Sequence, residues 1–347
     1  MSSKVVVSRH LGDQAMNILS QCSDLDLVIW PHDRKVDREW LLENVKDAEE
    51  YQNGSSDPSL SSKKVDRELV AAAGSTLKIV STMSVGYDHV DVSELKSKGI
   101  KLGFTPDVLT DAVADIAVML ALMASRDVKQ SMDIVQTGKW PSTPWSPFLL
   151  TGPQLSTPGT TVGFIGFGRI AQATLARIIA FGVSRILYTR SSPPNSSTSA
   201  QDKEILEKYP SLKEARHVTI RDLAKASDFI FVLAPGGEKT YHLVNSEFLG
   251  WMKPEAILIN PGRGSVVDSD ALAEALRERK IWGAGLDVVD GEPNVPADHP
   301  LVKEPRAVVL PHIGSATVQT RLAMASLAAE NLVAGIKGEA MPSEAEL

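Results

Sequence analysis

The sequence predicts an α/β fold with two domains, each built on a doubly wound parallel sheet. Short β-branched and aliphatic runs alternate with helix-length segments, which is typical of parallel strands covered by helices on both faces. The chain has 347 residues, more than one hydrophobic core usually organises, so two cores are expected. A third observation is a strand-like run, 161–166, that leads into a glycine-rich turn and an amphipathic helix.

Apolar runs and helical patterns place the elements in order. The runs expected to form strands are 5–7, 25–30, 77–81, 100–104, 161–166, 184–189, 228–233, 256–260, 284–288 and 307–311. Residues 110–126 are apolar almost all round, which predicts a buried helix that crosses between the domains. Residues 316–336 predict a second long helix that stops at Gly338 and returns the chain to the first domain.

Composition excludes several classes of function. Lys and Arg total 36 against 43 Asp and Glu, so a net charge of -7 offers no basic footprint for nucleic acid. Cys22 is the only cysteine, which excludes an internal disulfide and predicts a free intracellular thiol. There is no apolar run of roughly 18 residues, no signal peptide and no peroxisomal tripeptide. We therefore expect a cytoplasmic protein without a membrane or nucleic-acid partner.

A polar tract, 52–64 (QNGSSDPSLSSKK), falls where the alternation requires a third buried strand. Leu60 is its only large apolar residue, so we expect no core strand to form from it. Losing several buried aliphatic side chains, at roughly 1.5 to 3 kcal/mol each, rivals the stability of a whole domain. Either another segment substitutes for the strand, or the sequence carries a splicing or gene-model error that would compromise activity. Of these two explanations, we favour a splicing or gene-model error.

The turn after residues 161–165 reads Gly166-Phe-Gly168-Arg169-Ile170-Ala171, which is G-x-G-x-x-A. The first glycine permits a tight turn, the second lets backbone approach a pyrophosphate, and the small Ala171 allows close helix packing. A glycine-rich turn alone is a weak signal. Here strand, turn and helix follow in the right order, which favours dinucleotide binding.

About 20 residues beyond such a turn, an acidic residue would bind the ribose hydroxyl of NAD. This chain has Tyr188, Thr189, Arg190 and Ser191 instead. A guanidinium and two hydroxyl groups suit a 2′-phosphate, so NADP(H) is predicted over NAD(H). A solvated Arg190 at the entrance of a loop is the structural alternative, and NAD(H) remains the alternative cofactor.

Three further segments each follow a predicted strand: 260–264 (NPGRG), 286–293 (LDVVDGEP) and 310–317 (LPHIGSAT). The first belongs to a longer motif, 248–267 (FLGWMKPEAILINPGRGSVV). With these motifs the chain resembles the D-isomer-specific 2-hydroxyacid dehydrogenase family over nearly its whole length. The segments STMSVGYDH, TPDVLTD and GEAMPSE bring it closest to members that reduce glyoxylate and hydroxypyruvate.

The resemblance implies three catalytic residues, Arg263, Glu292 and His312. A 2-keto acid needs a cation for its carboxylate, a proton donor for its carbonyl oxygen, and a group that keeps this donor protonated. Arg263 can present a planar fork to the substrate, while Glu292 favours the imidazolium form of His312 and fixes its tautomer. Taken singly, each is more often structural, as an ion-paired Arg, a turn Glu or a satisfied His.

Other family positions carry over one at a time. Val85 and Gly86 match a loop whose backbone N–H groups hold the substrate carboxylate, or they form a plain turn. The positions implied for the cofactor are Thr110, Gly166, Gly168, Arg169, Ile170, Thr189, Arg190, Ser191, Pro235, Thr240, Asp287, His312 and Gly314. Asp287 would receive the nicotinamide carboxamide, or serve as an N-cap or salt-bridge partner; Thr110 could equally be an N-cap. Asp115 stands where the family usually has Glu, with no role that we can assign.

The resemblance also implies how the domains divide the chain. A Rossmann nucleotide-binding domain spans residues 106–313, and a smaller flavodoxin-like substrate domain combines 1–105 with 314–347. A homodimer is expected, with Trp140 or Trp145 on the arm between protomers. No metal is expected, because hydride transfer to a keto acid requires none. The remaining histidines show no metal-ligand spacing and are predicted to be structural or solvated: His10, His32, His89, His217, His242 and His299.

The predicted function is NADPH-dependent reduction of glyoxylate to glycolate and of hydroxypyruvate to D-glycerate, with His312 as the general acid. Two alternatives stay open. One is a phosphoglycerate dehydrogenase-like enzyme, which the missing NAD-type acidic residue disfavours. The other is a dinucleotide-sensing binding protein similar to the C-terminal-binding-protein corepressors, which share the fold and much of the site.

Overall fold

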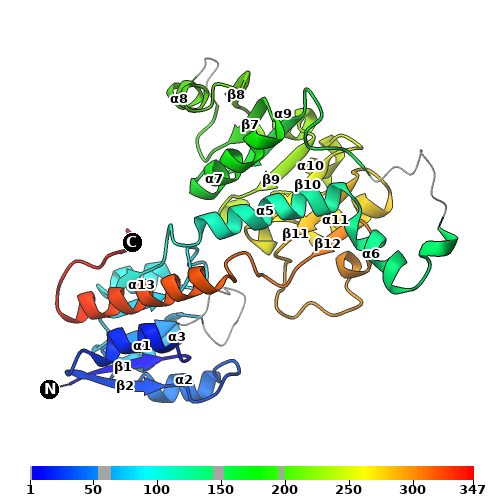
Figure 1. Ribbon diagram of the computed structural model, residues 1–347. Coiled ribbons are helices and arrows are strands. Elements are labelled where there is room, and N and C mark those ends of the chain that lie inside the picture. Colours follow the sequence, from blue (N-terminus) through cyan, green and yellow to red (C-terminus); the bar gives the residue numbers. More distant parts are fainter. Residues whose placement is uncertain (1, 54–63, 144–151, 195–198) are drawn as a thin grey trace. The chain divides into compact units, whose positions relative to one another are not determined.

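The computed structural model describes residues 2–53, 64–143, 152–194 and 199–347 (Figure 1). The chain forms two compact units. One combines Met1–Leu109 with Ser315–Leu347, and the other is Thr110–Gly314. Among the described helices, none is long and apolar enough to cross a membrane.

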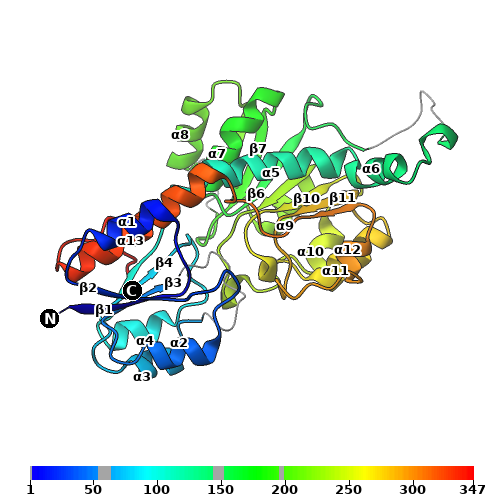
Figure 2. The same cartoon turned by 60° about the horizontal axis from the view of Figure 1, so that its bottom comes forward.

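The first unit holds one sheet and the helices that cover it. Its elements are β1 (Ser3–Val7), α1 (Asp13–Ser20), β2 (Leu25–Ile29), α2 (Arg38–Asn44), β3 (Glu50–Asn53), α3 (Arg67–Ala73), β4 (Ile79–Thr82), α4 (Val92–Ser97), β5 (Lys101–Gly103) and α13 (Val318–Ile336). The strand order is β2-β1-β3-β4-β5, and every pair is parallel. This is the flavodoxin-like order. Helices α1 and α13 cover one face, and α2, α3 and α4 lie on the other (Figure 2).

The second unit is larger and opens with the apolar helix that the sequence predicts. Its elements are α5 (Thr110–Ser125), α6 (Val128–Gln136), η2 (Trp140–Ser142), β6 (Thr161–Ile165), α7 (Arg169–Ile178), η3 (Ile179–Phe181), β7 (Arg185–Thr189), α8 (Ala200–Lys208), β8 (Glu214–His217), α9 (Ile220–Ala226), β9 (Phe229–Val232), η4 (Glu238–Thr240), α10 (Ser246–Trp251), β10 (Ile257–Asn260), η5 (Gly264–Val266), α11 (Ser269–Arg277), β11 (Gly283–Leu286), α12 (Pro300–Lys303) and β12 (Ala307–Val309). Its sheet runs β12-β11-β10-β9-β6-β7-β8.

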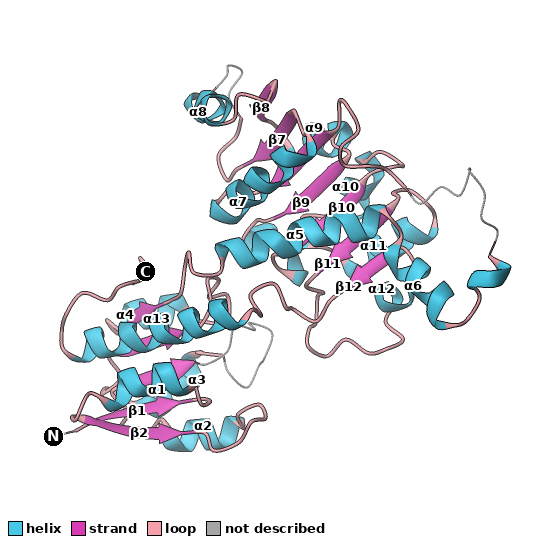
Figure 3. Ribbon diagram, in the orientation of Figure 1, coloured by secondary structure: helices cyan, strands magenta, loops and turns pink. Residues whose placement is uncertain are grey.

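Both sheets are entirely parallel, so the predicted α/β class with two doubly wound sheets is confirmed (Figure 3). In the seven-stranded sheet the order reverses between β6 and β9, which is the switch point where open α/β sheets bind ligands. Two cores lie on the faces of this sheet. One packs α5 and α7 against it, and the other packs α9, α10 and α11.

The centre of the five-stranded sheet corrects one expectation. Strand β3 lies between β1 and β4, with Tyr51 opposite Val6 and Val80, and its last residues belong to the polar tract 52–64. The expectation that no core strand forms is wrong, and the inference of a splicing or gene-model error loses its basis. Backbone hydrogen bonds make a strand from any non-proline residues, and neighbouring strands supply the apolar surroundings. Residues 54–63 lie outside the described part.

An ion-pair cluster explains Asp115. The Arg177 side chain on α7 donates to Asp115 over 2.5 Å and to Asp111 over 3.0 Å, and both carboxylates lie on α5. Asp111 and Asp115 are largely exposed, so the pairs link α5 to α7 but contribute little stability. Helix α7 begins at the glycine turn. Asp115 therefore has its ion-pair partner in the last turn of the helix on which dinucleotide binding is expected.

Candidate active site

The glycine turn at the end of β6 has the shape that a pyrophosphate needs. Gly166 has a φ of 85°, and a Cβ there would lie 2.9 Å from the Cα of Ala234. At Gly168 a Cβ would meet nothing within 4 Å, so this surface is open to a ligand. No side chain caps the start of α7, whose first residues are the exposed Arg169 and the half-buried Ile170. Helix α7 therefore begins beside an open glycine surface, without a side-chain cap.

The end of β7 lies beside this turn. The hydroxyl of Thr189 accepts a hydrogen bond from the Gly166 N–H over 3.3 Å, which ties the two strand ends together. Arg190 and Ser191 follow, and both are exposed. Burial and the nearby Arg190 charge lower the pKa of His217, at the end of β8. The Arg190 guanidinium thus lies at the carboxyl edge of the sheet, close enough to His217 to affect its pKa.

The loop after β9 contains Pro235 and Thr240. The Thr240 hydroxyl donates to the carbonyl oxygen of Pro235 over 2.7 Å, with the Gly237 carbonyl 3.1 Å away, so the loop is closed on itself. Thr110 is the first residue of α5. These residues belong to the same unit as the glycine turn.

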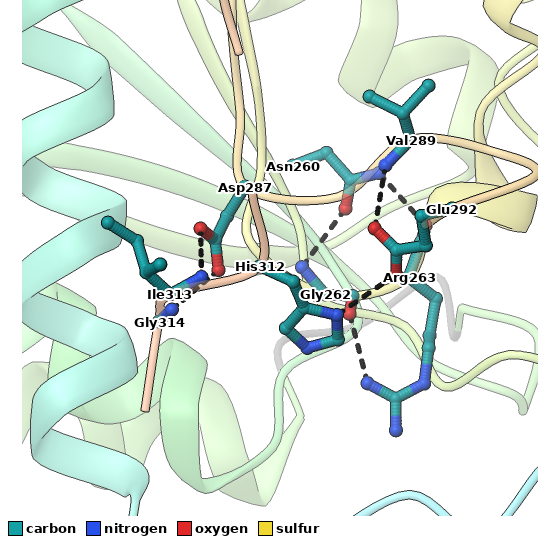
Figure 4. A network of polar contacts seen from close by, with 9 residues as sticks. All are labelled: Asn260, Gly262, Arg263, Asp287, Val289, Glu292, His312, Ile313 and Gly314. Carbon is teal, nitrogen blue, oxygen red and sulfur yellow. Dashed lines mark hydrogen bonds and ion pairs between the residues drawn. The ribbon is translucent and has the colours of Figure 1, made fainter. Parts of the chain in front are cut away.

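The His312 ring is held by Glu292. Its Nδ1 lies 3.0 Å from Glu292 Oε1, and the second carboxylate oxygen accepts the Val289 N–H over 3.2 Å (Figure 4). Only 20% of the His312 side chain and 14% of the Glu292 side chain are exposed, so little water screens the pair. Because Nδ1 is engaged, Nε2 is the ring atom left to exchange a proton with a ligand.

Asn260 shapes the loop that carries Arg263. This residue ends β10 and is fully buried. Its amide donates to the Arg263 carbonyl over 2.9 Å and accepts the Gly262 N–H over 3.1 Å. The half-buried Arg263 side chain extends toward the same side as the His312 ring (Figure 4). The sequence reasoning assigned no role to Asn260; a buried polar residue at a strand end was the available signal.

Asp287 supports the segment of His312. Its two carboxylate oxygens accept the N–H groups of Ile313, over 2.8 Å, and Gly314, over 2.7 Å (Figure 4). The His312 N–H donates to the Asp287 carbonyl over 2.8 Å. Burial raises the pKa of Asp287, while the two N–H groups oppose the shift. A Cβ at Gly314 would lie 2.8 Å from the carboxylate, so any larger residue there must displace the Asp287 side chain.

The loops of Arg263 and Glu292 pack backbone against backbone. A Cβ at Gly264 would lie 2.2 Å from the carbonyl carbon of Val289 and 2.6 Å from the Asp290 nitrogen. Glycine is therefore required for this approach. The second unit thus brings together Arg263, Glu292 and His312, which are separate in sequence.

Val85 and Gly86 lie in the other unit. They form part of the turn that follows β4 and are half-buried. Their position at the carboxyl end of a central strand is where parallel sheets present ligand-binding loops.

The second unit has the features of a dinucleotide-binding oxidoreductase domain. Its glycine turn and open helix N-terminus can hold a pyrophosphate, and Arg263, Glu292 and His312 supply a cation and a carboxylate-held imidazole. The family model described as D-isomer specific 2-hydroxyacid dehydrogenase, NAD binding domain, matches residues 118–314. The chain belongs to this family, and the predicted family and enzyme class are confirmed.

Relatives that align along nearly the whole chain support the same family assignment. The chain is 41% identical to the glyoxylate reductase/hydroxypyruvate reductase of Homo sapiens, over 99% of this chain and 98% of that protein. It is 39% identical to the glyoxylate reductase of Thermofilum pendens, over 98% and 93% of the two chains. A solved NADPH-dependent glyoxylate/hydroxypyruvate reductase of Sinorhizobium meliloti, in complex with NADP and malonate, superposes with a TM-score of 0.79 at 33% identity, covering 99% and 97%.

Proposed function

We propose that this enzyme uses NADPH to reduce glyoxylate to glycolate and hydroxypyruvate to D-glycerate. The observation that carries the proposal is the Glu292–His312 pair, 3.0 Å apart, in the same unit as the braced loop of Arg263. The human relative, which aligns along nearly the whole chain, is named for both activities, and the Thermofilum pendens relative is named for glyoxylate reduction.

His312 is proposed to supply the proton. Bound NADPH would supply the hydride to the keto carbon. The proton leaves Nε2 of His312 for the carbonyl oxygen, while Glu292 keeps its hydrogen bond to Nδ1 and stabilises the imidazolium beforehand. In the reverse direction the neutral ring accepts the proton from the hydroxyl group. The ring is therefore the general acid in one direction and the general base in the other.

Arg263 is proposed to bind the substrate carboxylate and polarise its carbonyl through two parallel hydrogen bonds. The backbone N–H groups of Val85 and Gly86 are proposed as a second carboxylate site. Asp287 is proposed to receive the nicotinamide carboxamide as well as to brace the His312 segment. Its burial and its two backbone partners restrict that carboxylate to one orientation.

The preference for NADPH is proposed to reside at the end of β7. Thr189, Arg190 and Ser191 occupy the place of the acidic residue that would bind the ribose of NAD. Gly168, Arg169 and Ile170 are proposed to hold the pyrophosphate. Thr110, Pro235, Thr240 and Gly314 complete the proposed cofactor site.

We further propose that Thr110–Gly314 is the cofactor domain and that the other unit binds substrate, in a cytoplasmic homodimer. Within the part of the chain that the structure describes, no side chain of helix α6 is fully buried, and Met132, Val135 and Trp140 are 50%, 57% and 66% exposed. A second copy of the chain would cover this apolar surface. Trp145 lies outside the described residues.

Steady-state oxidation of NADPH and NADH, each with glyoxylate and with hydroxypyruvate, tests the proposal. We expect turnover with both keto acids and a higher kcat/KM with NADPH. A folded protein that binds NADPH but turns over neither substrate would favour the corepressor-like alternative. Preferential oxidation of 3-phosphoglycerate with NAD would favour the phosphoglycerate dehydrogenase-like alternative.

A further inference from the structure

His242 lies in a strained loop between the segments of Arg263 and Glu292. Its φ of 48° places a non-glycine residue in the left-handed region, which costs free energy and is retained where the surroundings impose it. The loop follows η4 and leads into the strand-like segment at Val244, which pairs with Val267. Sequence reasoning placed His242 among the structural or solvated histidines.

The imidazole ring bridges two carboxylates. Its Nε2 lies 3.1 Å from Asp290 Oδ2, and its Nδ1 lies 3.8 Å from Asp268 Oδ2. The Tyr241 ring stacks on it, with centroids 3.9 Å apart and planes at 14°. The contact between the two side chains is half-buried, with 30% of His242 and 35% of Asp290 exposed. The stacking and the two carboxylates together leave the ring one orientation.

The backbone of the same residue attaches to the segment of Arg263. The His242 N–H donates to the Ser265 carbonyl over 2.9 Å. The next pair along is the Val244 N–H with the Val266 carbonyl, at 3.0 Å. His242 is therefore fixed by its backbone to residues two positions beyond Arg263.

Asp290 belongs to the turn that presents Glu292. The Glu292 N–H donates to the Val289 carbonyl over 3.1 Å, and the Val289 N–H donates back to the Glu292 carboxylate over 3.2 Å. A shift of this turn moves the carboxylate that holds His312. Backbone packing at Gly264 sets how close the turn lies to the Arg263 loop. This packing provides no directional polar contact, whereas the His242 ring contacts the Asp290 carboxylate.

We propose that His242 is a positioning residue for the reduction: its backbone is tied to the Arg263 segment, and its ring holds Asp290 and thereby the Glu292 turn. This inference rests on the proposed function. His242 does not touch the reacting atoms. It sets the place of Glu292, and through it of the His312 ring, relative to Arg263, and small misplacements of such groups reduce turnover strongly.

Variants of the full chain separate this role from a merely structural one. His242→Asn suits a positive φ but is too short to reach Asp290, whereas His242→Gln can place an N–H near the position of Nε2. We expect kcat with glyoxylate to fall about 10-fold in His242→Asn and in Asp290→Ala, with an unchanged KM for NADPH and an unchanged melting temperature. His242→Gln should recover most of the turnover. Asp298→Ala, at an exposed site on the same long loop, is the matched control.

The double variant His242→Asn/Asp290→Ala should lose no more turnover than Asp290→Ala alone, because both changes remove one contact. Losses that multiply, or a His242→Asn enzyme with wild-type kcat, would overturn the inference. Hydrogen exchange at the amides of residues 289–292 tests, independently of activity, whether His242 holds the Glu292 turn in place. Faster exchange in His242→Asn than in wild type supports the inference, and equal rates overturn it even if the wild type reduces neither keto acid.

Discussion

The central strands of the two sheets bury side chains of different polarity. In the seven-stranded sheet, β6 and β9 (TVGFI and FIFV) are almost wholly apolar, and their one polar residue is Thr161 at the start of β6. In the five-stranded sheet, the central strand β3 reads EYQN, and all four side chains are buried. Asn260 and Asp287, at strand ends of the second unit, are equally buried, but their side chains have the hydrogen-bond partners that Glu50 and Gln52 of β3 partly lack among the described residues.

Hydrogen-bond partners determine whether a buried polar side chain stabilises or destabilises the fold. Asn260 and Asp287 are fully buried at strand ends, and each is satisfied by backbone groups of a functional loop. Within the described residues, Glu50 Oε2 and Gln52 Oε1 have no hydrogen-bond partner. Burial, and secondarily the charge of Glu49, raises the pKa of Glu50 to about 9. A buried polar group without a partner costs about 1 to 3 kcal/mol, whereas a satisfied one stabilises a single geometry.

The largest expected effect is at the site of the seven-stranded unit. His312→Asn keeps a residue suited to the φ of 54° but removes the acidic proton. We expect kcat for glyoxylate reduction to fall about 10²- to 10⁴-fold, with the melting temperature unchanged. His32→Asn, at an exposed site, should keep full turnover. Turnover retained in His312→Asn would refute the assignment of the general acid.

The close backbone packing at Gly264 gives the next largest effect. Gly264→Ala would place a Cβ 2.2 Å from the Val289 carbonyl carbon, so the loops of Arg263 and Glu292 must separate. We expect a loss of about 3 kcal/mol in the free energy of unfolding, with little activity in the folded fraction. Gly250→Ala on α10, where a Cβ would meet nothing within 4 Å, should not destabilise the protein. Denaturant titrations of both variants make the comparison.

In the five-stranded unit, replacing a buried ionisable carboxyl by an amide should stabilise the protein. Glu50 keeps its proton in the folded state up to about pH 9, whereas the unfolded chain releases it near the ordinary value of 4.5. Stability therefore falls as pH rises from about 4.5 to 9, and it is unaffected by this group below that range. Glu50→Gln should raise the free energy of unfolding by about 2 to 3 kcal/mol at pH 8 and very little at pH 5.

Glu49 provides the matched control for this pH dependence. The hydrogen bond from Lys78 lowers the pKa of this neighbouring, half-buried carboxyl, so its contribution is present above pH 4.5 and is lost as pH falls. Glu49→Gln should change stability by less than about 1 kcal/mol at any pH. A Glu50→Gln variant that is no more stable than wild type at pH 8 would contradict an uncompensated buried carboxyl.

The smallest expected effect is at Arg190, an exposed cation whose proposed partner is the cofactor. Arg190→Ala should raise the KM for NADPH about 10-fold and leave the KM for NADH unchanged, because only NADPH carries the 2′-phosphate. Arg216→Ala, another exposed arginine on the neighbouring strand β8, is the control. Equal effects on both cofactors would place the phosphate contact elsewhere.

Structural features that depend on the residue pattern within one segment could be predicted from the sequence. The alternation of apolar runs predicted every strand except β3 and β8, since both contain few consecutive apolar residues: EYQN and EARH. The helices at 110–126 and 316–336 were found within two residues of their ends, because long apolar faces leave little ambiguity. The glycine turn was predicted from G-x-G-x-x-A, where each residue type has its own steric reason.

Contacts between segments were not predictable from the local sequence. Nothing near His242 indicates that its ring lies 3.1 Å from Asp290, 48 positions away. The two backbone partners of the Asp287 carboxylate are also visible only in the fold, as is the pairing of Asp115 with Arg177. Each contact depends on how loops at the carboxyl ends of different strands meet, which periodicity does not encode.

By itself, the sequence determined the α/β class, the dinucleotide turn and the family, because these follow from hydrophobic period, glycine sterics and long motifs. Only the tertiary structure decided that EYQN is a central strand and that its polar side chains lack some partners. A strand needs backbone neighbours more than it needs apolar side chains of its own, and those neighbours come from β1 and β4. Tertiary structure likewise decided which polar groups brace the residues proposed for catalysis, because a hydrogen bond depends on distance in space.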